Sequence, residues 1–330
     1  LAAITPDSLN PEELTLIDPA CGSGHILVEA YELFKAIYLE HGYRQRDVPR
    51  LILEKNLFGL DIDGRAAQLT SFALMMKGRA DDRRLLERGV KLNVMALVDS
   101  AEFDAEGLAT GLVLSDYGLK PVDLTELKLL FEYATTFGSL IQVPEGLAGK
   151  LPALKQLSGA TSQDLFVSEA LKRLGPLMQQ GELLAAHYDA VVVNPPYLSS
   201  KGMTVEVKAF LKHHFPFGQK DLFAAFMIRS LDWTESASSS VALVTPYNWM
   251  YLSTFEDLRG QLIERSTIRS LVELETNAFE PAMVSVCSFV VQRNAIDSNV
   301  GCYIRLSDFK GAQNQAPRVL EAIRNRSCGW

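Results

Sequence analysis

The sequence predicts an α/β fold of three layers, in which a doubly wound, mostly parallel sheet lies between two layers of helices. Short apolar runs alternate with longer segments of helical periodicity, the pattern of parallel strands joined by helices. The 330 residues are 48% hydrophobic and 22% charged, enough apolar material for one large globular domain. This composition excludes a disordered chain.

The first half of the pattern begins with the strand LTLID, which stops at Pro19 and is followed by a turn of small residues and a helical segment. A second strand and helix follow, and then a third strand. The predicted elements are strands at 14–18, 56–63 and 91–99 and helices at 26–39 and 64–76.

Residues 100–187 interrupt the alternation, because they are rich in Leu, Ala, Glu and Lys and poor in β-branched runs. We expect a helical insertion there. The alternation then resumes and closes with antiparallel strands. These later elements are strands at 188–194, 241–246, 270–275, 284–292 and 301–306 and helices around 204–214, around 221–234 and from about Ser253.

Composition also excludes several classes of protein. No apolar stretch approaches the length of about 18 residues that a membrane helix needs, and residues 1–10 do not form a signal peptide. The four cysteines, at positions 21, 287, 302 and 328, form no CxxC pair, so neither a disulfide framework nor a metal site is predicted. We expect a cytoplasmic protein that has no membrane partner.

The formal net charge of −8 argues against a protein that coats nucleic acid nonspecifically. One segment is locally basic: it carries Lys201, Lys208, Lys212 and Lys220 against Glu206 alone. These lysines form either a solvated helix face or a groove that contacts DNA phosphates.

The glycine loop DPACGSGH turns a strand into a helix at Gly22 and Gly24, where the backbone can approach a ligand closely. A dinucleotide fingerprint would need a third glycine where Leu27 stands, and a phosphate loop would need a Gly-Lys-Ser/Thr run. The loop therefore suits a nucleoside ligand without a diphosphate.

Two acids follow predicted strands and suit the same ligand. Asp61 can accept hydrogen bonds from two ribose hydroxyls, since Asp63 is the better candidate for capping the next helix. Asp18 either faces the crevice at the carboxyl edge of the sheet or is a turn residue before Pro19.

The apolar run YDAVVV stops abruptly at Asn194, Pro195, Pro196 and Tyr197. Two consecutive prolines end a strand, because neither has an N–H for the ladder and each fixes its own φ.

DPACGSGH, GLDID and NPPY, in that order, resemble the cofactor loop, ribose acid and catalytic motif of N6-adenine DNA methyltransferases. The segments KDLFAAFMIRSLDW, VALVTPYNWM and ELETNAFEPAMVSVCSFVV continue the resemblance, which is greatest to the phage-defence (BREX, PglX-type) branch. It implies a class I methyltransferase fold, which is Rossmann-like, with S-adenosyl-L-methionine as cofactor. It also implies methyl transfer to N6 of a flipped-out adenine in double-stranded DNA, in a phage-defence or restriction-modification system.

The resemblance assigns a role to each matching position. Asn194, Pro195, Pro196 and Tyr197 are the catalytic residues, and Tyr197 and Phe279 stack on the flipped base. The third-motif acid is Asp99, with Asn93 as a competitor. The cofactor-binding residues are Asp18, Pro19, Ala20, Cys21, Gly22, Gly24, Asp61, Ile62, Asp99 and Asn194.

These residue types suit an exocyclic amine. The adenine N6 lone pair is delocalised into the ring, so the nitrogen becomes nucleophilic only when acceptors hold its hydrogens in a tetrahedral arrangement. The Asn194 side chain and the Pro195 carbonyl supply two such acceptors, fixed before reaction begins. A base inside a duplex cannot reach them, so it must be flipped out and held by stacking.

Two other functions fit the same motif. NPPY also serves methyltransferases of protein glutamine or of RNA guanine N2, and a catalytically idle module could use this fold to hold DNA or a partner. We expect residues 1–330 to form one catalytic domain, a core that binds its cofactor weakly and reads no DNA sequence. The resemblance implies a target-recognition domain after the catalytic one, and we expect that domain to be absent from this chain, which ends at Trp330. Double-stranded DNA and other defence-system proteins are the expected partners.

Overall fold

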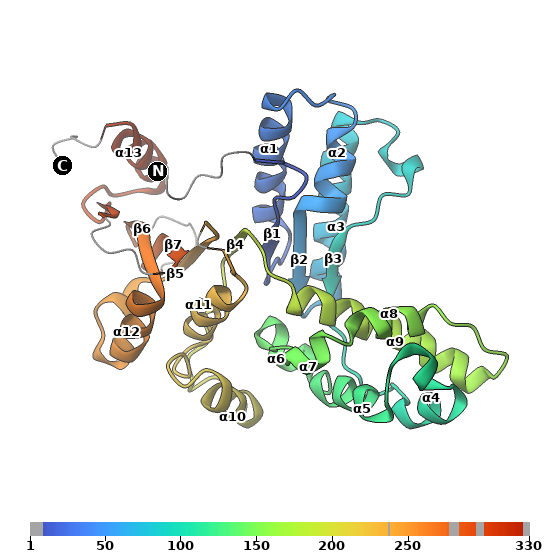
Figure 1. Cartoon of the computed structure of the whole chain (residues 1–330). Coiled ribbons are helices and arrows are strands. Elements are labelled where there is room, and N and C mark those ends of the chain that lie inside the picture. The colour runs from blue at the N-terminus through green and yellow to red at the C-terminus, as the bar shows by residue number, and fades with distance from the viewer. Residues whose placement is uncertain (1–8, 237, 277–283, 295–299, 326–330) are drawn as a thin grey trace. The chain divides into compact units, whose positions relative to one another are not determined.

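The computed structural model of the chain describes residues 9–236, 238–276, 284–294 and 300–325. It divides into two compact units (Figure 1). The first is Asp18–His187, and the second combines Leu1–Ile17 with Tyr188–Trp330.

The strands confirm the predicted α/β class. Their hydrogen-bonded order is β3-β2-β1-β4-β5-β7-β6-β8. Their bounds are β1 Leu16–Asp18, β2 Leu57–Asp61, β3 Asn93–Ala96, β4 Ala190–Val193, β5 Ser240–Pro246, β6 Ser266–Glu273, β7 Val286–Arg293 and β8 Cys302–Arg305.

In the first unit β2 and β3 run parallel, with Phe58 opposite Asn93 and Asp61 opposite Ala96. Helices α1 (His25–Glu40) and α3 (Gly64–Asp81) pack against β2 and against each other. The inner face of α1 buries Leu27, Tyr31 and Phe34, spaced three and four residues apart as an amphipathic helix requires. The short helix α2 (Val48–Leu51) and a π-helix at Ile52–Asn56 lead into β2, and neither was predicted.

The insertion between β3 and β4 is helical, as predicted. Its helices are α4 Ala105–Gly111, α5 Pro121–Leu130, α6 Ala134–Phe137, α7 Glu145–Ala148, α8 Leu151–Ser158 and α9 Leu165–Ala185. Gln180 of α9 is fully buried and forms hydrogen bonds with both the N–H and the carbonyl of Val98, at 2.9 and 3.0 Å. This pair of bonds fixes the longest helix of the insertion to the segment after β3.

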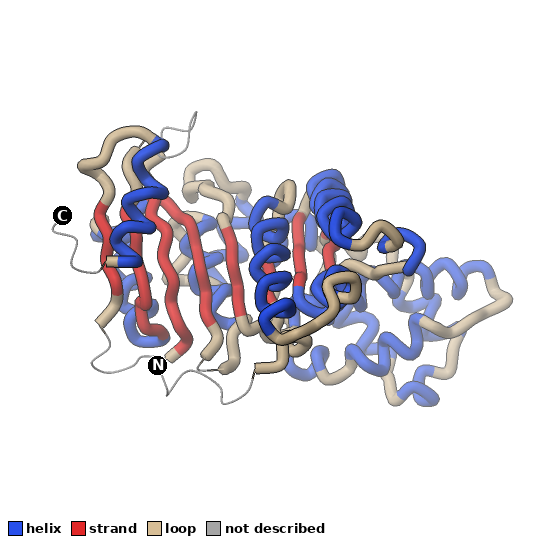
Figure 2. Tube along the Cα trace, turned by 90° about the horizontal axis from the view of Figure 1, so that it is seen from above, coloured by secondary structure: helices blue, strands red, loops and turns tan. Residues whose placement is uncertain are grey.

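In the second unit β1, β4 and β5 are parallel neighbours, with Ile17 opposite Val191 and Val193 opposite Leu243. β7 lies antiparallel between β5 and β6, which confirms the antiparallel ending predicted for the sheet. β8 differs from the predicted antiparallel ending, because it pairs with β6 in parallel. Figure 2 shows helices on both faces of these strands.

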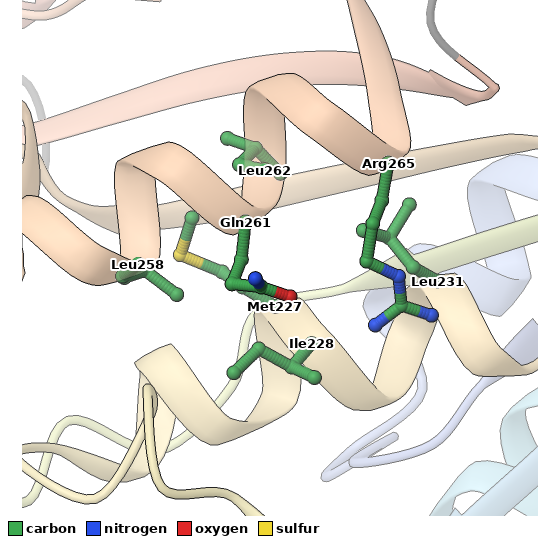
Figure 3. A pocket seen from close by; sticks show the side chains of 7 residues that line it. All are labelled: Met227, Ile228, Leu231, Leu258, Gln261, Leu262 and Arg265. Atoms are coloured by element: carbon green, nitrogen blue, oxygen red, sulfur yellow. The ribbon is translucent and has the colours of Figure 1, made fainter.

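The helices of the second unit are α10 Val205–His214, α11 Leu222–Asp232, α12 Glu256–Arg265 and α13 Ala312–Arg324. α11 packs on β5 and α12 on β6. A shallow, mainly apolar hollow lies between α11 and α12 (Figure 3), lined by Met227, Ile228, Leu231, Leu258, Gln261, Leu262 and Arg265. α13, which sequence patterns did not predict, adds Ala322 to a small core with Ile304 and Leu306.

The described ranges contain neither a membrane span nor a cluster of metal ligands. No helix there combines the length and apolarity needed to cross a membrane. No group of three or more His, Cys, Asp or Glu side chains there is arranged to hold a metal ion.

Candidate functional site

The glycine loop of the first unit is a tight turn fixed by backbone bonds. The N–H of Cys21 donates to the carbonyl of Leu60 at 2.9 Å, and the N–H of Gly24 donates to the carbonyl of Cys21 at 2.8 Å. Gly22 and Gly24 have φ of 52° and 83°, in the left-handed region that favours glycine. The sequence pattern therefore identified a real conformational requirement.

The two glycines differ in what surrounds them. A Cβ at Gly24 would lie 2.9 Å from both Cγ2 and Oγ1 of Thr70, whereas a Cβ at Gly22 would meet nothing within 4 Å. Buried Thr70, on α3, also donates its hydroxyl to the Gly22 carbonyl at 2.8 Å. Gly24 thus permits close packing of the loop on α3, while Gly22 borders open space. Sequence reasoning missed Thr70, because nothing local marks a contact 48 residues away.

Asp61 holds the loop from the end of β2. Its Oδ2 accepts from the N–H of Gly22 at 2.8 Å, and its Oδ1 accepts from the N–H of Asp63 at 2.9 Å. Each carboxylate oxygen has further acceptor capacity, so two ribose hydroxyls remain possible donors. Asp63 caps α3 as predicted, because its side chain accepts from the N–H of Arg65 at 2.8 Å.

Asp18 is a buried carboxyl at the start of the loop, with 1% of its surface exposed. Its Oδ1 accepts from the N–H of Ala20 at 3.1 Å. Burial raises its pKa from 3.8 to about 7; the Ala20 hydrogen bond lowers the pKa, and the nearby charge of Asp61 raises it. Asp18 is therefore a turn residue and also an acid whose ionisation depends on what neighbours it.

Other predicted cofactor residues are distributed around this loop. The Pro19 carbonyl accepts from the buried hydroxyl of Ser139 at 2.5 Å, so the insertion supports the loop from its far side. Cys21 is buried, and burial, followed by the charge of Asp18, raises the pKa of its thiol to about 12. Ile62 is apolar yet 53% exposed. Ser139 carried no sequence signal, because it lies within the insertion.

The two candidates for the third motif have structural partners of their own. Both oxygens of Asp99 accept from Thr135, one from its N–H and one from its hydroxyl, each at 2.8 Å. Asn93 stands at the beginning of β3, where its Nδ2 donates to the Glu54 carbonyl at 3.0 Å. Asp61, at the end of β2, lies opposite Ala96, so Asn93 is at the end of β3 that is farther from Asp61. The role of Asp99 in binding the cofactor stays a prediction.

In the second unit, NPPY begins directly after β4. Asn194 is exposed, Pro195 is buried and Pro196 is exposed. The hydroxyl oxygen of Tyr197 lies 2.8 Å from Oδ1 of Asn194 and 3.0 Å from the Val244 carbonyl oxygen at the end of β5. Burial raises the pKa of Tyr197 to about 12, so the hydroxyl keeps its proton at neutral pH.

The Tyr197 ring is fixed in place while 38% of the residue remains exposed. The ring of Phe223 meets it edge to face, with centroids 6.5 Å apart. Phe223 is fully buried in the first turn of α11. An exposed ring in a fixed orientation suits stacking on a base.

The segment after NPPY is tied to the start of α11. Asp221 caps that helix and also accepts from the N–H of Leu198 at 3.1 Å, while the N–H of Leu222 donates to the Leu198 carbonyl at 3.1 Å. Burial raises the pKa of Asp221, and its backbone hydrogen bonds lower it. Asp221 and Phe223 therefore support the NPPY segment.

The remaining predicted residues lie on the surface or outside the described residues. Lys201, Lys208, Lys212 and Lys220 are all exposed, and none forms an ion pair with another described residue. Lys208 and Lys212 lie on α10, one turn apart. Phe279 lies outside the described residues.

Comparisons with known proteins identify relatives of the whole chain. It is 42% identical over 334 residues to the adenine-specific methyltransferase BrxX of Escherichia coli O9:H4 (strain HS), an alignment that covers 93% of this chain and 28% of that protein. It is 34% identical to the adenine-specific methyltransferase PglX of Lacticaseibacillus casei (strain Zhang), covering 97% of this chain and 27% of that protein. The chain thus spans less than a third of the length of these relatives.

Solved structures support the fold. The Type ISP restriction-modification enzyme LlaGI, solved as a nuclease-deletion mutant with a DNA substrate mimic, gives a TM-score of 0.56 at 8% identity, over 94% of this chain and 23% of that one. The ATP-dependent Type ISP enzyme LlaBIII bound to DNA gives 0.55 at 12% identity, over 94% and 19%. Residues 55–279 match the model of the Eco57I restriction-modification methylases. The family expected from the three motifs is confirmed, and the chain belongs to the Eco57I restriction-modification methylase family.

Proposed function

We propose that this chain is the catalytic part of a DNA methyltransferase that transfers a methyl group from S-adenosylmethionine to N6 of a flipped-out adenine in double-stranded DNA. The observation that carries the proposal is the end of β4, where Pro195 and Pro196 follow an exposed Asn194 beside a fixed, partly exposed Tyr197. The adenine-specific names of the two curated relatives support the choice of base.

The glycine loop fits such a methyl donor. The open space at Gly22 leaves backbone accessible, and Asp61 retains acceptor capacity for ribose hydroxyls. Exposed Ile62 offers an apolar surface to a purine, and Asp18 offers a buried acid. When bound, S-adenosylmethionine supplies the sulfonium methyl that the amine takes. Pro19, Ala20, Cys21 and Gly24 would shape the loop, and Asp99 is the proposed third-motif acid.

The second unit provides the groups that act on the amine. The Asn194 Oδ1 and the Pro195 carbonyl would accept the two N6 hydrogens, which favours a tetrahedral nitrogen with a localised lone pair. Tyr197 would stack on the base, joined by Phe279 from the opposite side. Because positioning supplies most of the rate, no tuned general base is required.

The proposed reaction uses both the glycine loop and NPPY. Both begin where a parallel strand ends, and those strands, β1 and β4, pair with each other. Ligands of open α/β sheets bind at the carboxyl ends of such strands. The position of each motif at the end of a parallel strand supports its proposed role in ligand binding.

The exposed lysines supply a contact for DNA. Lys201, Lys208, Lys212 and Lys220 have no ion-pair partner among the described residues, so phosphates would meet no competing carboxylate. Contacts of this kind position the duplex without reading its sequence. We also propose that the protein works in a phage-defence (BREX) or restriction-modification system, with further defence proteins as partners.

The test is methyl transfer by the full-length protein, using a methyl-labelled donor and three acceptors: plasmid DNA, a release factor and total RNA. We expect label in DNA, recovered as N6-methyladenine after nuclease digestion. Asn194→Ala should abolish it, whereas Ser199→Ala, a change at a nearby exposed position, should preserve it. Label found only in the release factor or the RNA would contradict the choice of substrate, and no label in any acceptor would contradict the enzymatic function.

A further inference from the structure

The contact between Tyr197, Asn194 and Val244 raises a question of proton placement. A hydroxyl has one hydrogen, yet the Tyr197 oxygen lies within bonding distance of two oxygens, Asn194 Oδ1 at 2.8 Å and the Val244 carbonyl at 3.0 Å. If the hydrogen points to either oxygen, the other becomes an acceptor facing an acceptor. Two acceptors that face each other repel, and the oxygen that the hydroxyl does not reach loses a hydrogen bond inside the protein.

Only one of the three groups can resolve this conflict. The Val244 carbonyl can only accept, and the Tyr197 hydroxyl can donate once and accept as well. The Asn194 amide can exchange its oxygen and its nitrogen by a half-turn about its last side-chain bond. After that half-turn the Asn194 Nδ2–H donates to Tyr197, and the Tyr197 hydroxyl donates to Val244. Every group in the chain is then satisfied.

We infer that Tyr197 is a positioning residue, whose hydroxyl fixes the Asn194 amide so that its Oδ1 faces away from Tyr197, toward the open side of the site. The inference rests on the proposed function, in which the amide must offer an acceptor to an amine. In the opposite orientation Asn194 would present two N–H donors to N6, which also donates.

The prolines and Phe223 make this arrangement possible. Pro195 and Pro196 have no N–H with which to continue pairing to β5, whose pairing with β4 is described up to Val193 and Leu243. The Val244 carbonyl, one residue further, therefore meets the Tyr197 hydroxyl. Phe223 holds the ring from the side, so the hydroxyl does not depend on substrate for its place.

The first test is kinetic and uses Tyr197→Phe, which keeps the ring but removes the hydroxyl. We expect kcat to fall by about tenfold, with little change in KM for DNA, because stacking is retained. Tyr251→Phe is the matched control: Tyr251 is 61% exposed, its hydroxyl donates to Glu273 at 2.7 Å, and its loss should leave kcat unchanged.

A double-mutant cycle separates orientation from packing. In the Asn194→Asp background the carboxylate has two acceptor oxygens and no donor end, so there is nothing to orient. Tyr197→Phe should then change kcat by less than about twofold. An equal loss in both backgrounds, or no loss beside Asn194, would overturn the inference.

The second test does not need activity. In protein with ¹⁵N-labelled asparagine, the Asn194 side-chain amide is identified by its absence in Asn194→Asp. We expect its hydrogen exchange to be slow and to become faster in Tyr197→Phe but not in Tyr251→Phe. Exchange that Tyr197→Phe leaves unchanged would overturn the inference. Methyl transfer that fails while the exchange pattern holds would count against the proposed function alone.

Discussion

Replacing Asp18 by Asn should make the protein more stable at alkaline pH relative to the wild type. The carboxyl is 1% exposed, and burial raises its pKa from 3.8 to about 7. Asn has nearly the same shape, and its side-chain oxygen can still accept from the N–H of Ala20. The substitution therefore removes the ionisation and little else.

The sign and size follow from proton linkage. The folded state binds the Asp18 proton more tightly than the unfolded state, so this contribution to stability is fully present below pH 3.8 and is lost as the pH rises to about 7. The whole change is about 4 kcal/mol, since each pKa unit corresponds to about 1.36 kcal/mol. About 3 kcal/mol of it falls between about pH 5 and about pH 8.5.

The measurement is urea unfolding of both proteins at these two pH values, without methyl donor. The difference in unfolding free energy, Asn variant minus wild type, should grow by about 3 kcal/mol from the lower pH to the higher. Asp116→Asn, at an exposed carboxylate of the same unit, should change stability by less than about 0.5 kcal/mol at either pH. A difference for Asp18→Asn that stays constant with pH would show that its carboxyl is hydrated in the folded state.

Three further predictions concern the loop, the NPPY support and the basic surface. Gly24→Ala should lower the free energy of unfolding by about 3 kcal/mol, because Ala would adopt a left-handed φ and clash with Thr70, whereas Gly22→Ala should lower it by about 1 kcal/mol through the φ penalty alone. Equal losses for the two variants in chemical unfolding would contradict this prediction. Asp221→Ala should cost about 1–2 kcal/mol by the same assay and lower kcat, because both the α11 cap and the bond to the N–H of Leu198 are lost, and unchanged stability would contradict it. Changing Lys208 and Lys212 together to Gln should reduce the slope of log affinity for DNA against log salt by about 2, and an unchanged slope in fluorescence anisotropy would exclude them as phosphate contacts.

Local patterns predicted the parts of the fold whose cause is local. The apolar run before Pro19, the glycines after it and the capping Asp63 each correspond to an observed strand end, turn or helix start. α13 was missed, because Pro317 lies inside it and its apolar face is small, with Ala322 packed in a core that includes Ile304 and Leu306. The π-helix at Ile52–Asn56 was missed because no sequence period marks it.

The site was predictable as a set of residues and not as a network. The spacing of Gly22 and Asp61 gave no sign that the carboxylate would accept from the glycine N–H. Thr70 and Ser139 support the loop from 48 and 120 residues away, distances over which a single sequence records nothing. Asp99 was predicted as a cofactor acid from its place after a strand, and nothing in the sequence indicated that both of its oxygens would accept hydrogen bonds from Thr135.

The proline pair of NPPY determines where β4 ends and how Asn194 is placed. Two prolines remove the N–H groups with which β4 would continue to pair, so the chain leaves the sheet at Asn194 with its side chain exposed. Alanine at both positions would restore those donors and allow the strand to extend past Val193, which would compete with Tyr197 for the Val244 carbonyl. A Pro195→Ala, Pro196→Ala double variant should therefore retain its stability within about 1 kcal/mol in chemical unfolding and lose methyl transfer. Retained transfer at the wild-type rate would show that the prolines are not what places the amide.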